Sequence, residues 1–402
     1  MDRTSPPLTT TLTAKHLEDH DRGAETTSAL VWHSATTRSS SLKSDVQLCM
    51  RFETSKGTVL SADNGRLVGA ESSKNRFTSL EICAGAGGLA LGLEQAGFDP
   101  VLLLDNRPIA CKTLKENRPG WDVRETDLLE FDPINDQHVY EIDLLSAGLP
   151  RLKAAAASAR TRGDQTEMDL FEATIMLVRG IEPRSLLIDN LPELATSSIY
   201  ASLREHLENL LTDLGYTCRW LVLNAADFGV PQDRKHGFLI AFKGTAVDFF
   251  EEPQAIQSRG LTVGRALYES MAARGWRGAN EWAEQADRIA PTLVGGSWDR
   301  GGADLGPTGS KKAWAKIGVD GGTIDDTIPG PDFQWVPSLG RSGMVRLTVE
   351  QAALLQGFPA GWHIAGRKTA RYRQIANAVP PPLAHALGLA IAGALRATTT
   401  AG

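Results

Sequence analysis

A glycine-rich loop offers the clearest chemistry in the chain. In EICAGAGGLALGL, Gly85, Gly87 and Gly88 follow a short apolar run and precede a helix-length segment. Because glycine has no Cβ, backbone amides there can approach a ligand closely, and the start of a helix favours an anionic group. The loop fits the dinucleotide fingerprint G-x-G-x-x-A, and Asp105 ends the next apolar run 20 positions beyond Gly85, where a ribose-binding acid belongs. The pattern predicts a site for a nucleoside-containing cofactor.

A second acid, Asp127, lies in RETDLLEF after the next strand-like run. At the carboxyl end of a parallel strand it would face the same crevice as Asp105. An aspartate at this spacing fits a turn or a helix N-cap equally well. From these residues alone, both a nicotinamide dinucleotide and S-adenosylmethionine remain open as the cofactor.

Short apolar runs alternate with helix-length segments from Phe77 onward, as in proteins that place such a loop at the edge of a sheet. The predicted strands cover residues 78–83, 100–105, 121–125, 142–147, 184–189, 218–224 and 237–242. The predicted helices cover residues 88–96, 108–117, 167–179 and 198–214. The alternation predicts an α/β fold with a doubly wound, mostly parallel, Rossmann-like sheet.

Composition divides the chain into four parts. Residues 1–75 are rich in Ser and Thr and predict a mobile arm with one weak hairpin, whereas residues 76–250 form the cofactor-binding domain. Residues 251–345 combine many glycines with five of the nine tryptophans, which predicts an irregular domain that carries recognition rather than a packed scaffold. Two apolar helices in residues 346–402 are expected to return to the large domain.

Charge and cysteine content exclude several classes. A net charge of −6 gives no overall basic surface, so nucleic-acid contacts would have to come from local clusters. The four cysteines are scattered without a CxxC pair, which argues against a disulfide framework and a zinc site, and no metal is expected. No apolar stretch approaches the roughly 18 residues of a membrane span, and the start lacks a signal peptide. These features predict a cytoplasmic protein that does not contact a membrane.

Three local basic clusters could contact phosphates, although a run of charges is commonly just a solvated face. Their members are Arg151, Lys153, Arg160 and Arg162; Lys311, Lys312 and Lys316; and Arg367, Lys368, Arg371 and Arg373.

Four separated motifs give the chain a family resemblance. EICAGAGGLALGLEQAGF, LNAADFGVPQDR, RLTVEQAALLQGFPAGW and RYRQIANAVPPPLAHALG occur in this order across residues 77–396, and together they resemble the DNA cytosine-5 methyltransferase family. The resemblance implies S-adenosylmethionine as cofactor, double-stranded DNA as partner, and target recognition by residues 251–345. The cofactor residues it implies are Cys83, Gly85, Gly87, Gly88, Asp105, Asn106, Asp127, Leu128, Pro150, Asn377 and Val379.

The family's chemistry requires particular side chains, because cytosine C5 is too poor a nucleophile to accept a methyl group unaided. In the mechanism that the resemblance implies, a cysteine thiolate adds to C6, a glutamate supports N3 and an arginine holds O2 of a base flipped out of the duplex. The family motif GGxPC supplies that cysteine. In IDLLSAGLPRLK, Pro150 is in register and Arg151 stands where the cysteine belongs. A guanidinium stays protonated and has no lone pair for attack.

Two further motifs depart from the family pattern. Where the family has Glu-Asn-Val, this chain has Asp189, Asn190 and Leu191, so the acid is shorter by one methylene. Where the family has Q-x-R-x-R, the chain keeps Gln232 and Arg234 but has His236 in place of the second arginine. The departures gather in the motifs that perform chemistry, whereas the cofactor loop keeps its glycines and its acid.

Other groups offer weak replacements for the missing nucleophile. Cys83, Cys111 and Cys218 are interpreted as small buried hydrophobic residues. His236 could act as a base, although a histidine beside a strand is more often structural. Arg151 is either a solvated loop charge or a cation at the vacated base pocket, where it would contact a phosphate or block cytosine.

The sequence therefore predicts a restriction-modification or defence protein that binds S-adenosylmethionine and DNA but is impaired in methylation by itself. It would act as a binding or regulatory module, as the partner of an active methyltransferase or of a restriction-system protein. A working methyltransferase that takes its nucleophile from a partner subunit or another thiol is the main alternative. A nicotinamide-dependent oxidoreductase is a weaker one, because it leaves the motifs after Asn224 unexplained.

Overall fold

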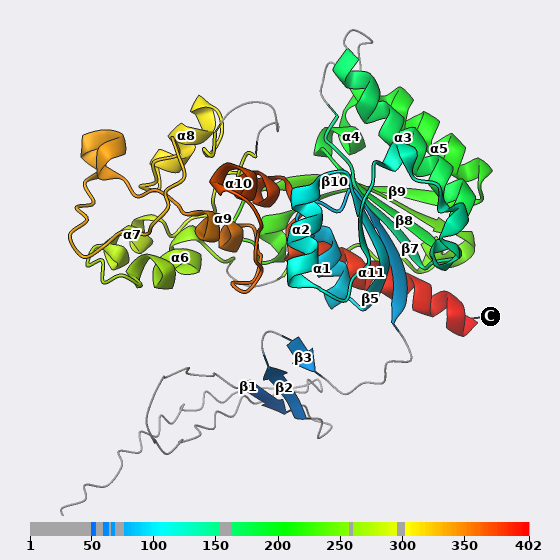
Figure 1. Ribbon diagram of the computed structural model, residues 1–402, viewed down its shortest axis with the longest axis horizontal. Helices are drawn as coiled ribbons and strands as arrows, with labels where there is room; N and C mark the ends of the chain where they lie inside the picture. Colours follow the sequence, from blue (N-terminus) through cyan, green and yellow to red (C-terminus); the bar gives the residue numbers. More distant parts are fainter. Residues whose placement is uncertain are drawn as a thin grey trace, which may run out of the picture. The chain divides into compact units, whose positions relative to one another are not determined.

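A computed structural model describes residues 50–53, 59–63, 66–68, 76–152, 162–256, 260–295 and 302–401 (Figure 1). The chain divides into two compact units, residues 1–72 and 73–402. In the first unit, β1 (Met50–Glu53), β2 (Val59–Asp63) and β3 (Arg66–Val68) form an antiparallel three-stranded sheet, one strand more than the predicted hairpin. The remaining residues of the predicted arm lie outside the described part of the chain.

The second unit is built on a seven-stranded sheet in the order β6-β5-β4-β7-β8-β10-β9. The strands are β4 (Phe77–Ile82), β5 (Phe98–Asp105), β6 (Val123–Glu125), β7 (Leu144–Gly148), β8 (Ser185–Asn190), β9 (Tyr216–Asn224) and β10 (Lys235–Lys243). All seven predicted strands are confirmed within a few residues. The sheet is parallel except for β10, which pairs antiparallel with both β8 and β9. This antiparallel hairpin departs from the parallel six-stranded order of the dinucleotide fold.

Helices cover both faces of the sheet (Figure 1). They are α1 (Gly88–Gln95), α2 (Pro108–Asn117), α3 (Arg162–Ile181), α4 (Pro192–Thr196), α5 (Ala201–Asp213) and α11 (Pro381–Ala401). Apolar side chains of α1 and α11 share one core cluster with the sheet, and those of α3 and α5 share another. Helix α3 begins before the predicted residue 167, and the predicted helix 198–214 is a short 3-10 turn followed by α5.

The closing apolar helix belongs to this core. Within the described residues, Lys368–Thr399 is long and apolar enough to cross a membrane by length and composition, which the sequence analysis did not expect. However, 61% of its apolar window is buried inside the protein. At the crossing of α1 and α11, a Cβ on Gly92 would lie 2.4 Å from the Cβ of Ala384. The close approach of these two helices is typical of a core helix.

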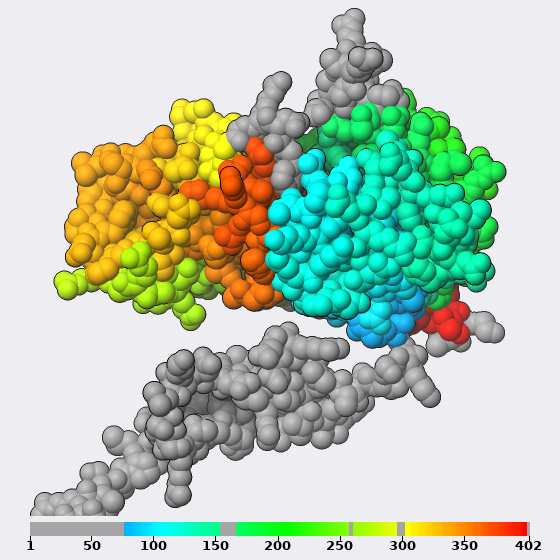
Figure 2. Space-filling view, viewed as in Figure 1, coloured from blue at the N-terminus to red at the C-terminus, as the bar shows by residue number. Residues whose placement is uncertain are grey.

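Residues 251–345 contain a packed core, so the prediction of a surface without a scaffold is wrong for this region. Helices α6 (Val263–Ala272), α7 (Ala279–Gln285) and α8 (Thr308–Ala315) pack with α9 (Val349–Leu355) and α10 (Lys368–Asn377). Trp276, Trp282 and Trp314 are buried in their shared apolar cluster. Figure 2 shows this region in yellow-green to orange, at the opposite end from the cyan and green of the sheet and its helices. The sequence of this region has little helical periodicity and therefore did not predict a core, but buried tryptophans form one.

An ion cluster closes this smaller core. The buried carboxylate of Asp320 accepts hydrogen bonds from Arg341 Nε at 2.7 Å, Arg346 Nε at 3.0 Å and the Gly322 amide at 2.9 Å. Burial alone would raise the pKa of Asp320, but these hydrogen bonds hold it below its ordinary value.

Replacing Asp320 with asparagine is expected to destabilise the protein by about 2 kcal/mol at neutral pH, because charged hydrogen bonds are lost. Because the pKa is lower in the folded chain, the contribution should begin to decrease as the pH falls below about 4, and it should be lost as the pH falls through the lower pKa of the folded chain. Urea unfolding of wild type and D320N at pH 7 and pH 3.5 tests this. A difference of equal size at both pH values would contradict the ionic account.

A buried acid lies in the central strand β4. Glu81 is 2% exposed and accepts hydrogen bonds from the Ser79 and Ser146 hydroxyls. Burial raises the pKa of Glu81 to about 7, although the two serines act in the opposite direction. The carboxyl group is therefore partly protonated at neutral pH.

Stability should fall as the pH rises from about 4.5 to about 7, because the folded chain binds the Glu81 proton more tightly than the unfolded chain does. The full loss is roughly 3 kcal/mol, at 1.4 kcal/mol per pH unit. Glu81→Gln should remove this slope. Thermal unfolding at pH 5, 6, 7 and 8 provides the measurement, with Asp99→Asn as an exposed control on the neighbouring strand β5. An unchanged slope in E81Q would contradict the assignment.

Candidate cofactor loop and base pocket

The glycine loop turns sharply between β4 and α1. Cys83, Gly85 and Gly87 all have positive φ, at 52°, 57° and 81°. The carboxylate of Asp105 holds the loop, accepting one hydrogen bond from the Gly85 amide and one from the Arg107 amide, each at 2.8 Å. Each carboxylate oxygen has a second lone pair, so the acid can still accept ribose hydroxyls while it fixes the turn.

The three glycines of the loop serve different purposes. A Cβ on Gly85 would meet nothing within 4 Å, which leaves room for a ligand against the backbone. A Cβ on Gly87 would lie 2.6 Å from Leu114 and 3.0 Å from Trp362, and one on Gly88 would lie 2.1 Å from the Val379 carbonyl oxygen. Gly87 and Gly88 are therefore required by packing, and the loop fits a cofactor at Gly85.

Trp362 is a positioning residue that the sequence analysis did not single out. Its indole Nε1 donates to the Ala86 carbonyl oxygen at 3.0 Å, and its ring packs on Gly87 and stacks with Phe358. Trp362 is the last residue of the motif RLTVEQAALLQGFPAGW, so the sequence contained the signal, but the motif alone did not indicate what this tryptophan contacts.

The other expected cofactor residues lie at neighbouring strand ends. Asn106 Nδ2 donates to Asp127 Oδ2 at 3.1 Å, and Asp127 Oδ1 caps the following turn by accepting from the Leu129 amide at 3.0 Å. Leu128 is buried. The capping interpretation of Asp127 is thus what the structure shows, and its Oδ2 edge is shared with Asn106.

The C-terminal segment returns to the loop at Val379. The carbonyl of Val379 lies against Gly88, whereas a Cβ on Gly295 would meet the amide of Asn377 at 2.5 Å. Gln356 Nε2 fixes the turn between them by donating to the Ala378 carbonyl oxygen at 2.6 Å.

A buried polar chain occupies the carboxyl end of β8 and the start of β10. Antiparallel pairing places Asp189 opposite Phe238, so His236 lies diagonally across on the same face. Asp189 Oδ1 lies 2.6 Å from His236 Nδ1, and Arg234 Nε donates to His236 Nε2 at 3.0 Å. Because Nε2 accepts a hydrogen bond, the imidazole is neutral and donates from Nδ1 to the carboxylate.

Burial and nearby cations set the charges of this chain. Burial, and then the positive charges of Arg234 and Arg151, lower the pKa of His236, against the opposing effect of Asp189. Burial and Arg151 also lower the pKa of Arg234, to about 9. His236 is therefore a structural bridge that orients Arg234 rather than a free base, as its position beside a strand suggested.

Asn190 fixes the loop that carries Arg151. Its Oδ1 accepts from the Leu152 amide at 3.2 Å, and its Nδ2 donates to the Pro150 carbonyl oxygen at 3.1 Å. The Arg151 side chain itself is exposed, and it has no hydrogen bond or ion pair to residues in the described part of the chain. Residues 153–161 lie outside the described residues.

The side-chain amide of Gln232 links two segments of the chain. It is fully buried, donates through Nε2 to Gln356 Oε1 at 2.8 Å and accepts at Oε1 from the Leu293 amide at 2.8 Å. Leu293 in turn accepts from Arg234 Nη1 through its carbonyl oxygen at 2.9 Å. Gln232 thereby positions residues that hold Arg234 without reaching the pocket itself.

The described cysteines lack the properties of a nucleophile. Burial, followed by the negative charges of Asp105 and Asp127, raises the pKa of Cys83 to about 12. Burial likewise raises the pKa of Cys111 to about 11 and that of Cys218 to about 12. A thiol reacts as its thiolate, so all three are inert at neutral pH. Cys49 lies outside the described residues.

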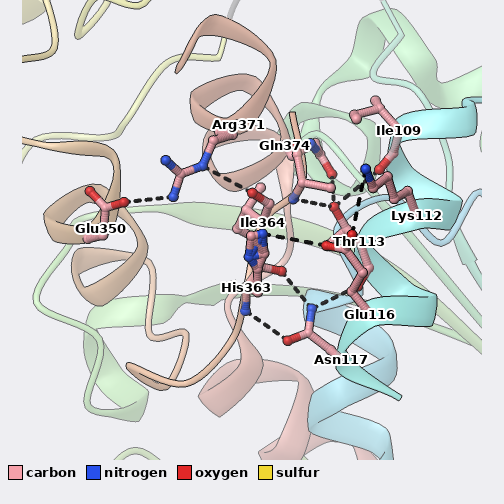
Figure 3. Close-up of polar contacts among 11 residues, drawn as sticks. Ile109, Lys112, Thr113, Glu116, Asn117, Glu350, His363, Ile364, Arg371 and Gln374 are labelled. Carbon is pink, nitrogen blue, oxygen red and sulfur yellow. Dashed lines mark hydrogen bonds and ion pairs between the residues drawn. The ribbon is translucent and has the colours of Figure 1, made fainter. Parts of the chain in front are cut away.

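The basic clusters are partly neutralised. Arg371 Nη2 donates to Glu350 at 2.7 Å and Arg371 Nε to the Ile364 carbonyl oxygen at 3.0 Å, as Figure 3 shows. Lys368 pairs with Asp326 and Lys311 with Asp304, each at 3.0 Å. Arg373 is buried. Among the described members Arg151, Lys312, Lys316 and Arg367 are exposed, whereas the side chains of Lys153, Arg160 and Arg162 lie outside the described part of the chain.

Helix α10 is also tied to the sheet domain. Thr113 on α2 donates to Gln374 at 2.7 Å, and Asn117 exchanges two hydrogen bonds with the backbone of His363 (Figure 3). The strand order and the cofactor loop, with its acid at the end of the next strand, define a methyltransferase of the Rossmann-like type.

Comparison with known proteins identifies the family. The family model described as C-5 cytosine-specific DNA methylase matches residues 77–393. The chain is 41% identical to the type II methyltransferase M.NaeI of Lentzea aerocolonigenes, covering 79% of this chain and 75% of that protein. It is 37% identical to M.NgoMIV of Neisseria gonorrhoeae, covering 80% and 99%. The Entamoeba histolytica methyltransferase EhMeth shares the fold, with a TM-score of 0.54, 13% identity and coverage of 79% and 98%.

The chain therefore belongs to the C-5 cytosine-specific DNA methylase family, whose methyl donor is S-adenosylmethionine. The relatives place it in the context of DNA methylation and restriction-modification.

Proposed function

We propose that this chain binds S-adenosylmethionine and double-stranded DNA but does not methylate cytosine by itself. The observation that carries the proposal is the hydrogen bond from His236 to Asp189, which engages the acid of the second motif inside the base pocket. Beside it, Arg151 stands where the family motif has its cysteine.

Because Asp189 is hydrogen-bonded to His236, its carboxylate is not free to contact a cytosine. Asp189 is 6% exposed and its Oδ1 is bonded to a fully buried imidazole. To contact cytosine N3, the carboxylate would have to leave His236 with its Nδ1–H group unpaired, at a cost of about 1–3 kcal/mol. The side chain is also one methylene shorter than glutamate. Misplacement by about 1 Å can cost on the order of 100-fold in rate.

The cofactor loop supports retained binding. Asp105 and the open backbone at Gly85 would hold the nucleoside, with Cys83, Asn106, Asp127, Leu128 and Pro150 around it. Bound S-adenosylmethionine supplies an electrophilic methyl group. The residues of this chain bind and orient the cofactor and shield it from water, and none of the described thiols is ionised to attack a base.

A chain of this kind would act as a regulatory or partner subunit in DNA modification or restriction, with residues 251–345 contacting the target sequence. If a partner subunit donated a cysteine loop, methylation would appear only in the complex. The antiparallel hairpin β9–β10 and the family match leave the oxidoreductase alternative without support.

Incubating the pure chain with methyl-labelled S-adenosylmethionine and mixed DNA tests the proposal, and calorimetry with the same cofactor runs in parallel. We expect cofactor binding without incorporation of label into cytosine. Multiple-turnover incorporation by the wild-type chain alone would overturn the proposal. Absence of cofactor binding would overturn its first half.

A further inference from the structure

Arg151 and Arg234 lie near the carboxyl end of β8, and neither has a hydrogen bond or ion pair to an acid among the described residues. Arg234 is 2% exposed, and among the described residues its guanidinium donates to two partners, His236 Nε2 and the Leu293 carbonyl oxygen. The neutral imidazole separates Arg234 from Asp189, so the buried charge is not directly compensated.

Arg151 adds a second positive charge on the loop that follows β7. Asn190, next to Asp189, clamps the backbone on both sides of Arg151. The clamp holds the backbone of Arg151 next to the end of β8, and the positive charge of Arg151 contributes, after burial, to the lowered pKa of Arg234 and of His236. An exposed arginine held beside a buried one is electrostatically unfavourable until an anion lies between them.

We propose that Arg151 and Arg234 form a binding site for a phosphate oxyanion at the position that the family uses for the target base. The planar donor fork of arginine matches the geometry of phosphate oxygens, and the Asp189–His236 pair would hold the Arg234 fork in place. The ligand is a phosphodiester of the DNA backbone or a free phosphate group. This inference rests on the proposed function, since a pocket that performed methylation would have to admit cytosine instead.

Titration with inorganic phosphate, followed through the imidazole NMR signals of His236, tests the site directly. Phosphate should shift the His236 signals saturably, because it changes the charge next to the ring. Arg151→Gln should weaken the phosphate affinity at least tenfold, since the variant keeps a polar side chain without charge. Arg179→Gln is the matched control, because Arg179 is an exposed arginine in the last turn of α3, outside residues 251–345.

Short duplex DNA distinguishes the two sources of phosphate. If the ligand is the DNA backbone, duplex should abolish the phosphate-induced shift, and R151Q should reduce the salt slope of DNA binding by about 0.9, the value for one lost phosphate contact. If phosphate and DNA bind independently, the site serves a free phosphate group. Absence of a His236 shift, or equal shifts in wild type and R151Q, would overturn the proposal. Neither result bears on methyl transfer, so the proposed function is tested separately.

Discussion

Arg151→Cys alone will not produce a working methyltransferase, whereas the triple variant Arg151→Cys, Asp189→Glu, His236→Arg will methylate cytosine on the order of 100-fold faster than the single variant. The single variant gains a thiol but keeps a short acid bonded to His236. In the triple variant, Asp189→Glu restores the length of the acid, and His236→Arg removes the imidazole that binds it and supplies the second arginine of the family motif. A misplacement of about 1 Å can lower a reaction rate by roughly 100-fold, which sets the size of the expected gain. Label incorporation per hour into the same DNA provides the measurement.

A thiol at another site controls for nonspecific reactivity. Arg277→Cys, combined with Asp189→Glu and His236→Arg, places the cysteine on an exposed loop between α6 and α7 and should remain inactive. Equal rates for R151C and the triple variant would show that the acid and the arginine do not limit the reaction. The hydrogen bond between His236 and Asp189 would then not hinder catalysis, although Arg151 would still stand where the family motif has its cysteine.

Asp105→Asn will weaken S-adenosylmethionine binding by roughly 100-fold. The carboxylate accepts from the Gly85 and Arg107 amides, and charged hydrogen bonds are worth about 1.5–3 kcal/mol each. An asparagine presents one N–H group toward an N–H donor, so one of the two bonds is lost together with the charge. The loop at Gly85 would then lose the conformation that leaves room for the cofactor.

Calorimetry with S-adenosylmethionine measures this loss, and Asp99→Asn is the matched control. Asp99 lies on the same strand β5, pairs with Arg76 at the exposed end and has no contact with the loop. Its variant should bind as wild type does. An unchanged affinity in D105N would show that the cofactor site lies elsewhere.

The sheet was predictable because its strands are short apolar runs between clear helix boundaries, and all seven were found. The second core was not, because Trp276, Trp282 and Trp314 come from segments of weak periodicity and pack only in three dimensions. Likewise, the spacing between Asp189 and His236 gives no sign of their contact. The contact depends on the antiparallel register of β8 with β10, which no local pattern encodes.

In the glycine loop, too, the sequence did not show which role each residue has. Three glycines between a strand and a helix predicted a cofactor site, yet Gly87 and Gly88 are fixed by Trp362 and Val379, which lie more than 270 positions away in the chain. The motif therefore combined a ligand requirement at Gly85 with two packing requirements. Only the structure separates them.

Covalent trapping tests most directly the proposal that this chain has no nucleophile for cytosine C6. In the family's mechanism, the thiol adds to C6 and the hydrogen on C5 must later leave. A fluorine at C5 cannot leave in that way, so a covalent adduct would persist. Mass spectrometry of the wild-type chain after incubation with S-adenosylmethionine and fluorocytosine-containing DNA should find no adduct. An adduct on any cysteine of the wild-type chain would contradict the account.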